Sequence, residues 1–323
     1  MSTATPVPET WKLTGDDARQ VLRSTGRRHL LRDAFVRMRV ADGFSHARSL
    51  AYATSLVFVQ ATIAVVGLAT ALGQGANGII VRTMKAALPG PASTLLTQAV
   101  VQANHAGATH RWGGLTFGLV GTLITGSTLM GQVERGLNRV YGVEQDRPTL
   151  KKYGLALLLA VTAGALVIVA FTLLALGTSV GNSIDNHALN RFWGIARWPV
   201  AIVLVTAATT IVFRYSPRRR QPGLSWLAFG AAVSTTLWLL VTIGLGAFFS
   251  LSKSFGQTYG PLAGMVALLL WALLAAIALM FGGAIAAQLE AVRSGIREPQ
   301  DQEKVEHSDP DPSQPNPVLA GQS

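Results

Sequence analysis

The sequence predicts an all-α protein, a polytopic bundle of six helices that cross a membrane. Six charge-free stretches separated by short charged segments carry this prediction: 49–81, 112–133, 153–184, 198–213, 221–252 and 254–289. A helix needs about 20 apolar residues to cross the ~30 Å hydrocarbon core, and five of the stretches exceed that length. Because every backbone N–H and C=O must be paired inside lipid, we expect each stretch to be a helix.

The positions of the basic residues predict how this bundle lies in the membrane. Of the 27 Lys and Arg residues, 21 fall in the N-terminal segment, the second and fourth connections between spans, and the C-terminal segment. Lys and Arg are enriched in cytoplasmic segments next to spans. We therefore expect an even number of spans, with both termini on the cytoplasmic side.

The chain divides into three predicted regions. Residues 1–48 form a cytoplasmic segment, residues 49–292 the membrane domain, and residues 293–323 a disordered cytoplasmic tail that has little to bury. The predicted spans cover about 49–72, 113–133, 154–178, 198–215, 224–249 and 262–289. The fourth is the shortest, and we expect Pro199 in its first helical turn, where a missing N–H has no partner to lose.

Interfacial amphipathic helices are expected on both membrane surfaces. One helical face of the N-terminal segment is apolar: Leu30, Leu31, Ala34, Phe35 and Met38. Arginines, Arg37 among them, fill much of the remaining surface. Such a helix should lie in the cytoplasmic interface with its apolar face toward the lipid. On the opposite side, the connection 73–112 is predicted to hold one or two short amphipathic helices.

The net charge of +11 admits two interpretations. A nucleic-acid partner is one, but no RNA- or DNA-binding motif accompanies the charge. The other is that the basic residues, which lie next to the span ends, set the topology and bind anionic lipid head groups at roughly 1 kcal/mol per residue. We favour contact with membrane lipids and expect no nucleic-acid partner.

Side chains suited to catalysis or metal binding are not arranged in a recognisable motif. The six histidines form no H-x-x-x-H pair, cysteine is absent, and no phosphate-binding loop or paired intramembrane carboxylates occur. We therefore expect no enzymatic activity, no catalytic residue, no metal and no cofactor. Gln60 is a polar residue in the middle of the first span, and we expect a hydrogen bond between helices there or, alternatively, contact with a ligand.

Glycine pairs four residues apart predict close contacts between helices. Gly114 and Gly118 form such a pair in the second span, and Gly260 and Gly264 form another at the start of the sixth. Small residues at this spacing allow two helix backbones to approach closely. Packing within one bundle is the leading interpretation for the pair in the second span, with a dimer face and a hinge as its alternatives.

Three segments resemble a known family. The first, A-R-S-L-A-Y-A-T-S-L at 47–56, opens the first span; the second, G-L-N-R-V-Y-G-V at 136–143, follows the second span; the third, Y-G-P-L-A-G at 259–264, opens the sixth. Together they resemble the YihY/BrkB family of bacterial inner-membrane proteins, and within it the YhjD-like branch. Members were once labelled ribonuclease BN, and others are linked to serum resistance, lipid export or envelope maintenance. The resemblance implies a multi-pass protein of the bacterial inner membrane.

The leading hypothesis is a bundle that moves or organises an amphiphilic envelope lipid, with an anionic lipid as the favoured partner. Polar side chains beside the exit of the second span are the candidate head-group contacts: Arg135, Asn138, Arg139 and Arg147. The alternative is a scaffold that docks other envelope proteins without transport. A membrane ribonuclease is disfavoured because the catalytic groups are missing. The sequence predicts neither a particular protein partner nor an oligomeric state.

Overall fold

The computed structural model describes residues 4–72, 93–94, 98, 111–182, 187–252, 261–296 and 298–299. Within these ranges the regular structure is helical throughout, which confirms the predicted all-α class. Two shorter helices precede six long ones, in the order α1 Gly15–Thr25, α2 Arg27–Val40, α3 Gly43–Leu72, α6 Arg111–Val140, α7 Thr149–Asn182, α8 His187–Tyr215, α9 Leu224–Leu251 and α11 Pro261–Arg293.

The six long helices of the described chain are all long and apolar enough to cross a membrane, which confirms the predicted membrane bundle. Each predicted span lies within one of these helices. The expectation for Pro199 is wrong, because α8 already begins at His187 and Pro199 lies inside the helix. Arg191 and Arg197 interrupt the apolar run before Pro199. Hydropathy therefore starts the span too late, because the helix is already formed at His187.

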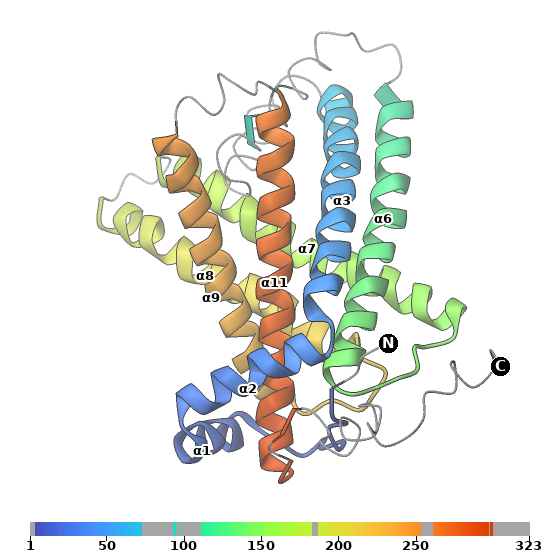
Figure 1. Ribbon diagram of the computed structural model, residues 1–323. Helices are drawn as coiled ribbons and strands as arrows, with labels where there is room; N and C mark the ends of the chain where they lie inside the picture. The colour runs from blue at the N-terminus through green and yellow to red at the C-terminus, as the bar shows by residue number, and fades with distance from the viewer. Residues whose placement is uncertain are drawn as a thin grey trace, which may run out of the picture.

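The long helices pack in a ring (Figure 1). The strongest contacts join neighbours in the order α3, α6, α7, α8, α9 and α11, and α11 returns to α3. Within this ring α7 crosses obliquely behind α3 and α11 in the view of Figure 1. Each spanning helix therefore has two principal neighbours, and the rest of its surface faces the centre of the ring or the surroundings.

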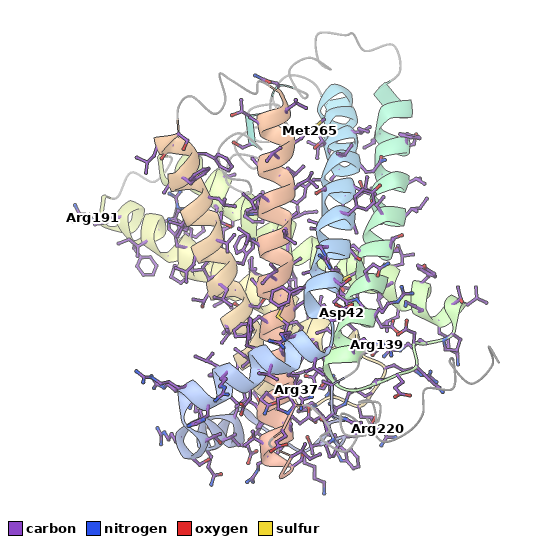
Figure 2. All side chains as sticks on the ribbon, viewed as in Figure 1. Arg37, Asp42, Arg139, Arg191, Arg220 and Met265 are labelled. Carbon is purple, nitrogen blue, oxygen red and sulfur yellow. The ribbon has the colours of Figure 1, made fainter. Side chains whose placement is uncertain are left out.

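One end of the bundle carries α1, α2 and the loops 141–148 and 216–223, and we call it the basic end. Arg37, Arg139 and Arg220 gather there (Figure 2). Helix α2 lies across this end in front of α11 (Figure 1). The predicted cytoplasmic residues of the described chain thus lie together at one end of the ring.

Contacts between α6 and α11 close the ring at the basic end. A Cβ atom added at Gly136 of α6 would lie 2.9 Å from the Cε of Met280, and one at Gly283 of α11 would lie 2.5 Å from a methyl carbon of Leu137. The larger apolar core of the described chain surrounds these contacts and includes the buried Leu289. Dense packing therefore seals the centre of the ring at this end.

Packing is looser toward the opposite end, where α6, α7 and α8 bury few side chains. Large apolar residues are exposed along these three helices: Phe117, Ile124, Ile168, Val169, Phe192 and Val203. A smaller core of α3, α9 and α11 residues continues there, and the Nε1 of Trp271 donates a hydrogen bond of 3.0 Å to Thr242. The two halves of the ring therefore differ in how much apolar surface they bury.

The predicted amphipathic helix is present as α2, but its contacts differ from the prediction. Leu30 and Met38 are buried against the bundle, whereas Leu31 and Phe35 are exposed, each by 47%. Arg37, expected on the polar face, is completely buried. The reason is that α11 and α3 offer α2 a protein surface. Only part of the apolar face is therefore left for the membrane interface.

Residues 4–13 form an irregular strap over the basic end, which we call the N-terminal strap. The backbone N–H of Val7 donates to the carbonyl of Tyr141 at 3.1 Å, and the N–H of Thr5 donates to the carbonyl of Pro299 at 2.9 Å. The strap therefore joins the end of α6 to the segment after α11. The two described ends of the chain lie at the same end of the bundle, as an even number of spans requires.

Some sequence predictions lie outside the described residues. These are the short helices expected in most of the connection 73–112, the disorder expected beyond residue 299, and the packing of Gly260. The division into regions at residues 48 and 292 also stays a prediction. The structure therefore describes mainly the ring of helices.

Single cysteines can test the orientation, since the chain has no cysteine of its own. Ser250 is exposed near the end of α9 that lies away from the basic end, and Gln145 is exposed in the loop 141–148. We expect Ser250→Cys to react with a membrane-impermeant maleimide in intact cells, and Gln145→Cys to react only after the cells are opened. The reverse pattern would place the basic end outside the cell.

Candidate functional site

The candidate head-group residues lie at the basic end, where α6 stops and the chain turns toward α7. Gly142 ends the helix with φ 76°, in the left-handed region that glycine adopts without strain. Three candidates lie in the last turns of α6 and the fourth lies just before α7: Arg135, Asn138, Arg139 and Arg147. Residues that are close in the sequence around the end of α6 are thus also close in space.

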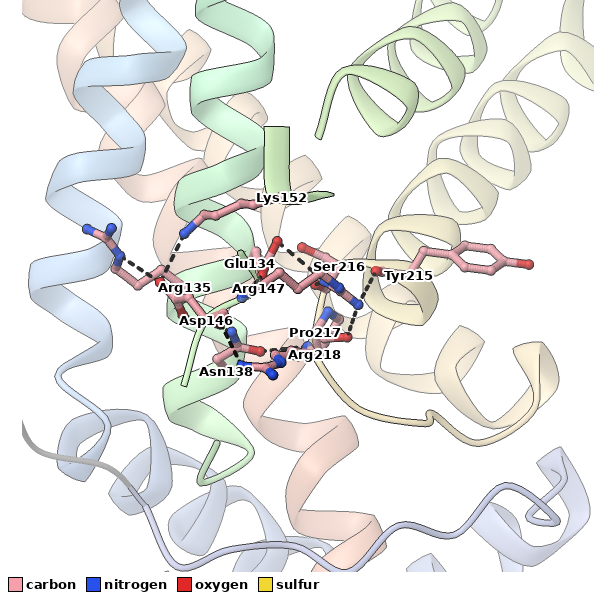
Figure 3. A network of polar contacts seen from close by, with 10 residues as sticks. All are labelled: Glu134, Arg135, Asn138, Asp146, Arg147, Lys152, Tyr215, Ser216, Pro217 and Arg218. Carbon is pink, nitrogen blue, oxygen red and sulfur yellow. Dashed lines mark hydrogen bonds and ion pairs between the residues drawn. The ribbon is translucent and has the colours of Figure 1, made fainter. Parts of the chain in front are cut away.

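Asp146 is the centre of a polar network that includes two of these residues, Arg135 and Asn138, and we call it the Asp146 network (Figure 3). Its carboxylate accepts hydrogen bonds from Asn138 Nδ2 at 3.0 Å and Lys152 Nζ at 2.9 Å, and it pairs with Arg135 Nε at 3.3 Å. Arg218 Nη1 donates to the Asp146 backbone carbonyl at 2.7 Å. One residue thus ties its own loop to α6, α7 and the loop between α8 and α9.

The pKa of Asp146 is lowered to about 2. Partial burial alone would raise it, but hydrogen bonds from Asn138 and Lys152, together with the charge of Lys152, favour the ionised carboxylate. The stability that this shift contributes is present above the ordinary value of 3.8 and is lost as the pH falls toward 2. Asp146 is therefore fully charged at neutral pH.

Arg147 holds the loop between α8 and α9 against α6. Its Nη2 donates to the carbonyl of Pro217 at 2.7 Å, and its Nη1 donates to the carbonyl of Ser216. The same Nη1 lies 3.3 Å from Oε2 of Glu134. Because the side chain of Glu134 is 3% exposed and that of Arg147 is 20% exposed, this ion pair lies within the protein.

Most of the candidate residues use their polar groups within the chain. Asn138 is completely buried, and its Oδ1 also accepts from the backbone N–H of Arg218 at 2.8 Å. Arg139 Nη1 donates to two carbonyls of the following loop, one of them at 3.1 Å. The side chain of Arg135, by contrast, is 42% exposed. Head-group contact stays a prediction for all four. Of the two candidates that form ion pairs, Arg135 and Arg147, Arg135 has the more accessible side chain.

Replacing Asn138 by leucine is expected to destabilise the fold by about 1–3 kcal/mol, because the Asp146 carboxylate and the backbone N–H of Arg218, whose bonds to Asn138 are partly buried, would each lose a partner. Thermal unfolding in detergent measures this change. Gln145→Leu, at an exposed position of the same loop, is the matched control and should melt like the wild type. Equal melting temperatures for all three proteins would show that the bonds of Asn138 do not stabilise the loop.

A second charged cluster lies at the basic end, and the sequence analysis missed it. Arg219 donates to both carboxylate oxygens of Glu290, at 2.7 and 3.2 Å, with side chains that are 2% and 0% exposed. The guanidinium also lies over the ring of Tyr141, 4.6 Å from its centroid. Beside this pair, Arg37 Nε donates to Gln288 Oε1 at 2.7 Å. We call these residues the buried ion cluster.

Burial governs the protonation of the cluster. It lowers the pKa of Arg37 to about 10 and raises the pKa of Tyr141 above its ordinary value. At neutral pH, Arg37 is therefore charged and Tyr141 neutral. Glu290 stands out in the sequence as an acid at the end of the sixth span, but its partner is 71 residues away, and no periodic pattern connects the two.

The N-terminal strap closes over the buried ion cluster. Thr10 donates to the Glu290 carboxylate from its backbone N–H at 3.2 Å and from its hydroxyl. Arg219 Nη2 donates to the carbonyl of Pro8 at 2.9 Å, and Arg37 Nη1 donates to another strap carbonyl at 3.0 Å. The charged groups of the cluster therefore hold the strap in place.

Gln60 lies in α3, where it faces α6. Its Oε1 is buried and accepts no hydrogen bond from the described residues. A Cβ atom at Gly121 would lie 2.5 Å from this oxygen, so the neighbouring helix offers no side-chain donor at that point. The expected hydrogen bond between helices is therefore absent at Oε1 within the described chain, and contact with a ligand stays a prediction.

The glycine pair of the second span lies in the contact between α6 and α3. A Cβ atom at Gly118 would collide with the backbone N of Ala64 and lie 2.5 Å from its Cα, and one at Gly114 would lie 3.9 Å from the Cα of Gly67. Both contacts are within one chain. Gly264 is buried near the start of α11.

Comparison with known proteins finds relatives of low identity. The chain is 25% identical over 265 residues to YfkH of Bacillus subtilis, a protein described as ribonuclease-like, and the match covers 80% of this chain and 94% of YfkH. It is 27% identical over 255 residues to a UPF0761 membrane protein of Azoarcus sp., covering 76% of this chain and 59% of the relative. A UPF0761 membrane protein of Halorhodospira halophila matches over only 39% of its length. The chain thus spans less than two thirds of these UPF0761 relatives. No solved structure matches it.

A family model supports the resemblance over a much longer range than the three motif segments. The model describes the virulence factor BrkB family and matches residues 34–308. The matched range includes all six helices of the ring. The chain therefore belongs to the BrkB virulence factor family.

Proposed function

We propose that this protein moves or organises an amphiphilic, anionic lipid of the bacterial envelope. The observation that best supports this function is the contrast between the two halves of the ring. One half is densely packed and carries the charged groups of the basic end, and the other is lined with exposed apolar side chains. We further propose that the protein resides in the bacterial inner membrane, with the basic end in the cytoplasm. Lys and Arg at that end are what the positive-inside rule favours.

The apolar half suits the tails of such a lipid. On α6, Phe117 and Ile124 are 67% and 62% exposed, and on α8, Phe192 and Val203 are 66% and 64% exposed. These side chains lie on candidate membrane spans, and those spans contain few large buried side chains. Hydrocarbon chains could cover such surfaces without requiring any hydrogen bond.

The basic end suits the head group. Arg135 and Lys152 share the single carboxylate of Asp146, so the Asp146 network carries a net positive charge. Basic side chains next to a membrane surface attract anionic lipids by roughly 1 kcal/mol each. An anionic head group is therefore favoured over a zwitterionic one at this end of the ring.

Reconstitution into liposomes tests the proposal. The purified protein is inserted into vesicles that contain fluorescent phosphatidylglycerol, and dithionite then quenches the label in the outer leaflet. We expect quenching to proceed beyond the outer-leaflet fraction faster than in vesicles that hold an unrelated helical membrane protein at equal density. Equal rates with several anionic lipids would overturn lipid movement. In that case, a single stoichiometric protein partner captured by crosslinking in the native membrane would favour the scaffold.

We propose no catalytic role for the chain, although YfkH is described as ribonuclease-like. Among the described residues, no three His, Asp or Glu side chains are grouped so that they could hold a metal ion. Incubating the purified protein with labelled single-stranded RNA, with and without divalent cations, tests this proposal. Cleavage that increases with protein concentration and is lost on heat denaturation would overturn it.

A further inference from the structure

A groove runs between α6 and α7 on the outside of the ring, and we call it the α6–α7 groove. It has a volume of about 610 Å³ and is open to the surroundings rather than enclosed. Residues about one helical turn apart form each wall: Val120, Ile124 and Thr128 on α6, and Leu150, Gly154 and Leu157 on α7. Because both stripes follow the helical repeat, the groove extends along the two helices.

The walls of the groove offer hydrocarbon contacts and few hydrogen bonds. The hydroxyl of Ser127 donates to the carbonyl of Leu123 at 2.7 Å, and that of Thr128 donates to the carbonyl of Ile124 at 3.0 Å. Backbone groups inside a helix are paired with one another. An extended polypeptide would leave its own backbone unpaired here, whereas an acyl chain has no polar group to satisfy. The chemistry of the walls therefore selects an acyl chain.

Small residues bring α6 and α7 together beside the groove. A Cβ atom at Gly126 would lie 3.4 Å from the Cβ of Ala160, and one at Gly131 would lie 3.5 Å from the Cε of Lys152. The stem of Lys152 thus lies over α6, and its ammonium group reaches Asp146. This arrangement places positive charge next to the groove.

Basic side chains lie near one end of the groove. Lys151 is exposed and directly follows Leu150, a groove residue that is 91% exposed. Lys152 follows it, and its ammonium group pairs with Asp146 (Figure 3). Two positive charges thus accompany one carboxylate. The apolar groove therefore ends beside a site of net positive charge. This combination matches the acyl tail and the phosphate of a phospholipid.

We propose that the α6–α7 groove binds one acyl chain of an anionic phospholipid from the leaflet at the basic end, and that Lys151 attracts its phosphate. Both helices are candidate membrane spans, so the groove is within reach of lipid. This inference deepens the proposed function. It rests on that function for one consequence, which is that lipid approaches the ring between α6 and α7. Binding itself can be measured separately from movement.

Photolabelling tests the site. The protein is placed in nanodiscs with phosphatidylglycerol that carries a diazirine on one acyl chain, and the labelled peptides are identified by mass spectrometry. A Cβ atom at Gly154 would meet no other atom within 4 Å, so Gly154→Phe should fill the groove without a clash. We expect label on 120–128 and 149–157 in the wild type. In Gly154→Phe it should fall about tenfold, which corresponds to the loss of about two buried methylene groups.

Gly164→Phe is the matched control. Gly164 also lies on α7, also has open space around a Cβ atom, and does not line the groove. Its labelling should equal that of the wild type. A second comparison tests the charge: Lys151→Glu should lower labelling by phosphatidylglycerol about fivefold, as expected for one Lys at an anionic surface. Labelling by phosphatidylcholine should not change, and Lys12→Glu, at another exposed position, should affect neither.

Label spread evenly over α8 and α9 and unaffected by Gly154→Phe would overturn the proposal, because it would show only ordinary solvation by the bilayer. All variants are first compared by thermal melting, and Gly154→Leu replaces Gly154→Phe if the larger residue prevents folding. The liposome assay on the same samples separates the two proposals. Lipid movement without groove labelling contradicts the α6–α7 site alone, whereas groove labelling without movement contradicts transport alone.

Discussion

Replacing Glu290 by alanine is expected to destabilise the folded protein by about 3–5 kcal/mol, the effect of leaving one partner of a buried ion pair uncompensated. Arg219 would lose bonds of 2.7 and 3.2 Å at a position where its side chain is 2% exposed. Arg37 lies in the same cluster and would lose the favourable charge of the Glu290 carboxylate. Thr10 would also lose its acceptor, so the N-terminal strap would be held less firmly. Unfolding in mixed micelles of detergent and dodecyl sulfate measures the loss.

Two further variants identify the cause of this loss. Glu290→Ala combined with Arg219→Met removes both charges, so the double variant should be more stable than Glu290→Ala alone. Asp16→Ala removes an acid from the pair with Arg19, whose side chains are 93% and 77% exposed, and should leave stability unchanged. If Glu290→Ala unfolds like the wild type, the buried ion cluster does not hold the basic end together.

Gly118→Leu is expected to disrupt the contact between α3 and α6, with a loss of at least about 3 kcal/mol, at the upper end of what overpacking costs. A Cβ atom at this position would collide with the backbone N of Ala64 and lie 2.7 Å from the carbonyl carbon of Ile63. Backbone atoms cannot move aside as a flexible side chain can. The two helices would have to separate, and thermal melting in detergent would detect it.

Gly244→Leu provides the matched comparison for the glycine experiment. Gly244 also lies in a spanning helix, α9, but a Cβ atom there would meet nothing within 4 Å. We therefore expect Gly244→Leu to melt close to the wild type, and size-exclusion chromatography should show both proteins unaggregated before melting. An equal loss of stability in the two variants would mean that glycine itself, rather than the close approach of α3, matters at Gly118.

The sequence predicts the spanning helices well because the bilayer imposes a length and an apolar composition on each of them. It fails where a helix continues past the apolar run, as at the start of α8, since residues such as Arg191 are compatible with a helix but not with a hydropathy window. The sequence also fails to show which apolar residues of α2 are buried against the bundle and which are exposed. Periodicity identifies Leu30 and Leu31 as apolar but does not distinguish contact with α11 from contact with lipid.

The candidate site illustrates a second limit. The sequence places Asn138 and Arg147 near each other because a short loop joins their helices, and both contact the loop between α8 and α9. The buried ion cluster could not be found in this way. Arg219 and Glu290 come from distant segments, and burial rather than residue type distinguishes them from the many exposed charges of the basic end. Only the contact between the loop 216–223 and α11 reveals that they meet.

The N-terminal strap has a consequence for the order of assembly. Thr10 is synthesised 280 residues before its partner Glu290. At about 5–20 residues per second, the strap waits for roughly 15–55 s before its partner is even synthesised. A chain that stalls before α11 is inserted therefore has a strap that can bind the end of α6 through Val7 but lacks its anchor at Glu290. The bond from Thr10 to Glu290 thus marks a chain whose last helix has reached its place.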